Sequence, residues 1–79
     1  MGHEKYGEEV MDRLPVSSST IASVGYDETI QVLEVEFIKT GIYQYMNVPL
    51  PTYEALMAAP SLGVFLNANI KGQFPYERL

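Results

Sequence analysis

Residues 30–37 read Ile30-Gln31-Val32-Leu33-Glu34-Val35-Glu36-Phe37, and residues 41–45 read Gly41-Ile42-Tyr43-Gln44-Tyr45. From Leu33 to Phe37 every second residue is apolar and the two between are glutamates, the period of a β-strand with one apolar face. Only a few residues separate the two stretches, whereas a parallel crossover needs about a dozen or more. They are therefore predicted to pair as an antiparallel hairpin.

The flanking sequence extends this pattern on both sides. Residues 20–26 are rich in β-branched side chains, and Asp27-Glu28-Thr29 is a turn before the strand at 30–37. The third strand is predicted over residues 42–48. The spacing of Tyr53, Leu56 and Met57 then predicts a helix that Pro60 ends, and Ser61 is a plausible N-cap for a second helix. The expected fold is α+β, a three-stranded antiparallel meander followed by two helices packed on one sheet face.

The 79 residues are enough for one domain. Residues 1–15 are polar, with clustered acidic side chains, and are predicted to be a mobile N-terminal arm. Residues 16–79 are predicted to be the single folded domain. The chain has no cysteine and no long apolar run, so we expect a soluble cytoplasmic protein without membrane spans.

The net charge of −5 is unevenly divided, with −6 in residues 1–36 and +1 in residues 37–79. Proteins that bind nucleic acids neutralise phosphates with clustered Lys and Arg, so the overall balance counts against strong binding. Only the C-terminal half is electrostatically open to a nucleic acid.

Tyr43 and Tyr45 lie two positions apart, so on a strand both rings project from the same face. Such a pair is either part of the core, an anchor for a protein partner, or a stacking platform for bases. A three-residue loop pairs Phe37 with Tyr43, and Val35 with Tyr45, on the apolar face. A two-residue loop sets both tyrosines opposite glutamates instead. We favour the first register because it places Gly41 where a positive φ is required.

No catalytic constellation accompanies the tyrosines. His3 has no acidic or cysteine partner at ligand spacing, and Ser17-Ser18-Ser19 has no base to activate a hydroxyl. We therefore expect no enzyme activity, no metal and no cofactor. Cationic residues near aromatic ones complete the candidate binding residues, although a helix-end charge and a solvated tail also explain them. The candidates are Tyr43, Tyr45, Lys39, Lys71 and Arg78.

A series of short motifs resembles one known family. They are Ser18-Ser19, Gly25-Tyr26-Asp27, Leu33-x-Val35-x-Phe37, Gly41-x-Tyr43-x-Tyr45, Val48-Pro49, Tyr53, Ala59, Ser61-x-Gly63, Phe65-x-Asn67 and Ile70-Lys71. Their order is similar to that of the KTSC domain over about residues 16–79. That family takes its name from the C-terminus of some lysyl-tRNA synthetases and also occurs as small stand-alone bacterial proteins. The resemblance implies no catalytic residues, and RNA binding is the function that it suggests.

Two hypotheses for a non-catalytic binding module follow. The first is weak, salt-sensitive RNA binding, which the resemblance favours. The alternative is a protein–protein interaction or self-association module, which the charge favours. Its basis is an apolar fraction of 47% and a set of apolar residues predicted for the second sheet face, Ile30, Val32, Ile42 and Met46.

Overall fold

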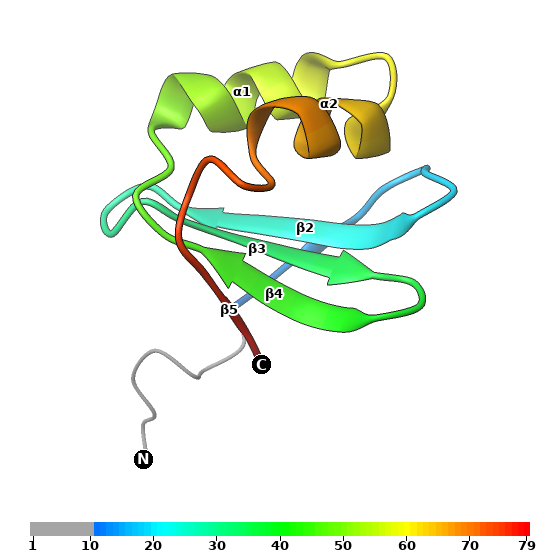
Figure 1. Ribbon diagram of the computed structural model, residues 1–79, viewed down its shortest axis with the longest axis horizontal. Helices are drawn as coiled ribbons and strands as arrows, with labels where there is room; N and C mark the ends of the chain where they lie inside the picture. Colours follow the sequence, from blue (N-terminus) through cyan, green and yellow to red (C-terminus); the bar gives the residue numbers. More distant parts are fainter. Residues whose placement is uncertain (1–10) are drawn as a thin grey trace.

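The computed structural model describes residues 11–79, which form one antiparallel sheet with two helices over one of its faces (Figure 1). The strands pair in chain order and are β1 (Leu14–Pro15), β2 (Ile21–Asp27), β3 (Val32–Phe37), β4 (Gly41–Tyr45) and β5 (Tyr76–Arg78). The helices are α1 (Leu50–Ala58) and α2 (Leu62–Asn69). The α+β prediction is confirmed. Neither helix of the described chain meets the length and apolarity that a bilayer-crossing segment needs.

The core lies between the sheet and the helices. Leu33 and Val35 of β3 are fully buried there, together with Leu56 of α1 and Leu66 of α2. The predicted helix boundaries hold, because Pro60 separates the helices and the Ser61 hydroxyl accepts a hydrogen bond from the Val64 N–H, 3.3 Å away. The apolar residues of both helices therefore cover one face of the sheet.

The β3–β4 hairpin has the predicted faces but a different register. Val35 pairs with Tyr43 and Leu33 with Tyr45, so both predicted pairings are wrong. The turn instead closes with Phe37 opposite Gly41, because the Ile38 N–H donates to the Thr20 carbonyl, 2.9 Å away. A shift of two residues keeps every side chain on its predicted face. Gly41 has the expected positive φ, +103°.

The C-terminal tail is a strand, which the sequence analysis did not predict. β5 pairs antiparallel with β4, and two further hydrogen bonds fasten its ends. The Met46 N–H donates to the Pro75 carbonyl and the Leu79 N–H to the Ile42 carbonyl, both at 2.8 Å. Phe74, just before β5, packs against the core and so holds the start of the tail next to the sheet.

The structure describes only the last five residues of the predicted N-terminal arm, residues 11–15. Residues 1–10 lie outside the described part of the chain, whereas residues 11–15, which were predicted to belong to a mobile arm, lie along the sheet. Leu14 pairs with Val24 in β1, and Arg13 forms an ion pair with Glu34. Glu34 was predicted for the outer face of β3, yet it is fully buried. The N-terminal segment covers it, because Met11 and Arg13 both hydrogen-bond to its carboxylate.

Candidate functional site

A hollow of about 210 Å³ lies where β3, β4 and β5 meet the end of α2. Four of its six lining residues are aromatic, and we call it the aromatic hollow. The lining residues are Phe37, Thr40, Tyr43, Tyr45, Lys71 and Tyr76. The structure thus brings together three of the five candidate residues, Tyr43, Tyr45 and Lys71.

The four rings of the aromatic hollow contact one another. Tyr43 meets Phe37 edge to face, with ring centroids 5.4 Å apart, and lies 5.7 Å from Tyr76. Tyr45 lies 5.9 Å from Tyr76 on the other side. Tyr45 and Tyr76 are directly paired across β4 and β5. Because the rings hold one another, the wall of the hollow is preformed.

The two predicted tyrosines differ in their environment. Tyr45 is only 2% exposed and belongs to the core, and this burial, followed by the nearby Tyr43 and Tyr76, raises the pKa of its hydroxyl. Tyr43 is half-buried at the edge of the core. Tyr76 is 59% exposed. The accessible aromatic surface of the hollow is therefore formed by Tyr43 and Tyr76, with Tyr45 as its base.

Positive charge surrounds this surface. Lys71, which follows the C-cap of α2, lines the hollow. Arg78 pairs with Tyr43 across the strands, and its Nε donates to the Thr40 carbonyl, 3.1 Å away. Lys39 is exposed in the same β3–β4 turn as Thr40. These are three of the four Lys and Arg residues in 11–79, and no carboxylate lines the hollow.

Sequence reasoning missed Phe37 and Tyr76 as members of this site. Phe37 was predicted on the apolar sheet face opposite Tyr43, and it contacts Tyr43 even though it pairs with Gly41, but it was not counted among the binding candidates. Tyr76 lies in the C-terminal tail, for which no strand was predicted. The available signal was the closeness of Phe74 and Tyr76 to the cationic Arg78 in the sequence.

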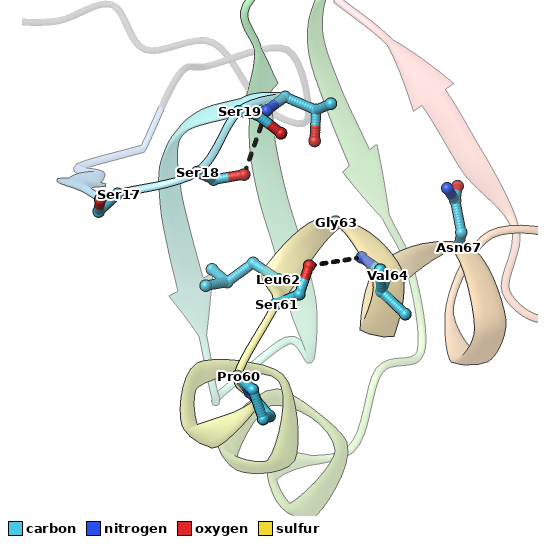
Figure 2. Close-up of a pocket in the computed structure, with 10 residues that line it drawn as sticks. Ser17, Ser18, Ser19, Pro60, Ser61, Leu62, Gly63, Val64 and Asn67 are labelled. Carbon is cyan, nitrogen blue, oxygen red and sulfur yellow. Dashed lines mark hydrogen bonds between the residues drawn. The ribbon is translucent and has the colours of Figure 1, made fainter.

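A second cavity, of about 350 Å³, lies between the segment before β2 and the start of α2 (Figure 2). Several motifs that carried the family resemblance meet here. The lining residues are Ser17, Ser18, Ser19, Thr20, Pro60, Ser61, Leu62, Gly63, Val64 and Asn67. The Ser18 hydroxyl accepts from the backbone N–H groups of Thr20 and Ile21, each 3.2 Å away. Ser61 caps α2, so these two hydroxyls organise the backbone.

The lining of the second cavity contains no side chain that could act as a catalytic base. Its lining contains no charged side chain and no histidine, so no base can activate a serine hydroxyl. Within residues 11–79 no three acidic, histidine or cysteine side chains lie close enough to hold a metal ion. The arrangement supports a structural role for the predicted polar entry into β2.

Comparisons with known proteins agree with this architecture. Residues 17–74 match the model of the KTSC domain family. A lysine–tRNA ligase of Nostoc sp. is 44% identical over 66 residues, which are 84% of this chain and 12% of that protein. An uncharacterized protein of Stutzerimonas stutzeri is 43% identical over 70 residues, 87% of this chain and 99% of the relative. The crystal structure of a KTSC domain protein from Yersinia pestis superposes with a TM-score of 0.86 and 43% identity, covering 89% and 99% of the two chains. The chain belongs to the KTSC domain family.

Proposed function

We propose that this protein is a non-catalytic, cytoplasmic module that binds single-stranded RNA in the aromatic hollow. One observation carries the proposal. Although the whole chain has a charge of −5, Lys71 lines the hollow beside the tyrosine rings, and Arg78 and Lys39 lie in the adjoining β5 strand and β3–β4 turn. Clustered cations beside aromatic faces are what single-strand binding requires.

In this proposal Tyr43 and Tyr76 supply the stacking surface and Tyr45 supports them from the core. Lys71, Arg78 and Lys39 contact phosphates. Three phosphate contacts predict that the logarithm of the affinity falls with the logarithm of salt concentration with a slope of about −2 for a single strand. The acidic remainder of the chain keeps the affinity low, so binding is expected at low ionic strength.

The relatives give independent support. A domain similar to this one is part of proteins named lysine–tRNA ligase, of which it makes up 12% of the length. Because the name of those proteins includes a tRNA, it supports RNA as the ligand class for the domain that they share with this chain. For this chain the RNA is proposed as the ligand class, without a defined sequence.

The experiment is an NMR titration of the ¹⁵N-labelled protein with tRNA and with single-stranded oligonucleotides at low salt. We expect saturable shift changes at Tyr43, Lys71 and Tyr76, which weaken as salt rises. Lys71→Gln should reduce the affinity. Ala55→Glu is the matched control, because like Lys71→Gln it makes the net charge one unit more negative, but at an exposed position of α1 that does not line the hollow. Absence of shift changes with every oligonucleotide would exclude the proposal.

Protein interaction or self-association stays the alternative. The second sheet face, which was expected to carry it, exposes less apolar surface than the sequence suggested. Of the apolar residues predicted for the second sheet face, Val32 is buried and Ile42 half-buried, while Ile30 lies exposed in the β2–β3 turn. Sedimentation tests this alternative directly. A concentration-dependent rise in mass would favour self-association, and a constant monomer mass would count against it.

A further inference from the structure

The sheet face opposite the helices carries a strip of polar residues and one glycine, Ser23, Gly25, Glu34, Glu36 and Gln44, and we call this strip the polar groove. Met11, Asp12 and Arg13 occupy this groove, and we call these three residues the strap. Figure 1 shows the first described residues of the chain passing the sheet on the side away from the helices. We propose that the polar groove is a binding site for an extended, arginine-bearing peptide segment, which this chain fills with its own strap.

The groove contacts all three nitrogens of the Arg13 guanidinium. Nε donates to the Ser23 hydroxyl, 2.8 Å away, and Nη1 is hydrogen-bonded to Glu34 Oε2. Nη2 lies 3.7 Å from Glu36 Oε1. The Ser23 hydroxyl in turn donates to Glu36 Oε1 at 2.8 Å, which fixes its orientation as an acceptor for Arg13. A planar fork of donors fits this arrangement, whereas the single ammonium of a lysine reaches only one of the partners.

The buried carboxylate of Glu34 requires a cationic partner in the groove. Its side chain is fully buried, and its Oε1 accepts from the Gln44 amide at 2.7 Å and from the Met11 backbone N–H at 3.3 Å. A buried carboxylate is costly without a charged partner, and Arg13 is its only such partner in residues 11–79. The strap therefore supplies both the counter-charge and a backbone donor.

Gly25 makes room for the peptide backbone. A Cβ at this position would lie 2.4 Å from the Asp12 carbonyl oxygen and 3.1 Å from Arg13 Cγ. The glycine thus lets a main chain cross the sheet at van der Waals contact. The groove recognises a guanidinium and an adjoining stretch of backbone, and neither depends on the covalent link through β1.

Chemical rescue in the full chain tests this site. Arg13→Ala should lower the melting temperature, and N-ethylguanidinium should raise it again in a saturable manner, with shift changes at Ser23, Glu34 and Gln44. Ethylammonium at the same concentration should have no such effect. If Arg13→Ala is unfolded at room temperature, N-ethylguanidinium should restore a dispersed NMR spectrum.

A peptide experiment tests the extended segment. An acetylated peptide with the sequence of residues 9–16 should bind Arg13→Ala, and the same peptide with lysine in place of the arginine should bind roughly tenfold more weakly. Leu14→Ala, which shortens an exposed side chain of β1 and leaves the Arg13 guanidinium in place, is the control and should respond to neither the peptide nor N-ethylguanidinium. Equal rescue by ethylammonium, or equal binding of the two peptides, would overturn the proposal.

Discussion

Gly63 of α2 lies directly against Thr20, so that a Cβ on Gly63 would come within 2.7 Å of the Thr20 hydroxyl oxygen. This contact closes one wall of the second cavity and joins the start of α2 to the entry of β2. The glycine therefore lets two distant segments approach closely, and its backbone has no positive φ that would favour glycine.

Gly63→Ala should destabilise the domain by about 1–3 kcal/mol, since overpacking outweighs the roughly 1 kcal/mol that alanine gains over glycine in a helix. Urea unfolding measures the change. In the double variant Thr20→Ala with Gly63→Ala the clash is absent, so the two effects should be non-additive. A single variant Gly63→Ala that is more stable than the parent would contradict this account of the contact.

Tyr76→Ala should weaken RNA binding by about 1–3 kcal/mol while leaving the fold intact, because the ring is mostly exposed and offers one stacking surface. Tyr45→Ala should instead cost about 3–5 kcal/mol of folding free energy, since this ring is buried in the core. Oligonucleotide titration and urea unfolding separate the two effects. Equal RNA affinity of Tyr76→Ala and the parent would remove Tyr76 from the proposed site.

The central part of the fold was predictable because its signals are local. The alternation in β3, the apolar spacing in α1 and the N-cap Ser61 are each carried by residues within a few positions of one another. β1 and β5 have two and three residues, too few for a period to appear. They exist because longer strands offer them hydrogen-bonding edges, which is tertiary information.

The candidate site was predictable only in part for the same reason. Tyr43 and Lys71 stand out in the sequence by type, whereas Tyr76 joins them through the β4–β5 pairing. The buried state of Glu34 was not predictable from β3 alone, because alternation assigns it to the outer face. Arg13, which lies 21 positions earlier, covers it.

Glu34→Gln should destabilise the protein by about 3 kcal/mol, because it leaves the Arg13 guanidinium in the groove without its buried counter-charge. This loss of folding free energy is at the lower end of the range for breaking a buried ion pair, because the Arg13 side chain is 16% exposed and keeps some contact with water. Urea unfolding measures it. Replacing both partners with apolar residues, Arg13→Met with Glu34→Leu, should be less harmful than Glu34→Gln alone. If the double replacement were the more damaging change, the ion pair would not explain the effect.

Stability should fall as pH rises above about 10, the ordinary pKa of tyrosine. Burial raises the pKa of Tyr45, and burial together with Glu28, Asp27 and Glu54 raises that of Tyr26. The folded state therefore keeps protons that the unfolded state releases, so the stabilisation is complete below the unfolded pKa and is lost above it. Tyr26 also donates from its hydroxyl to the Val48 carbonyl, 2.5 Å away.

Urea midpoints measured from pH 8 to pH 11.5 test this dependence. Tyr45→Phe should flatten the alkaline decline, because it removes a group that titrates differently in the two states. Tyr26→Phe should flatten it too, but should also cost about 1 kcal/mol at neutral pH for the lost hydrogen bond. An alkaline decline of undiminished slope in the Tyr26→Phe, Tyr45→Phe double variant would show that other groups cause it.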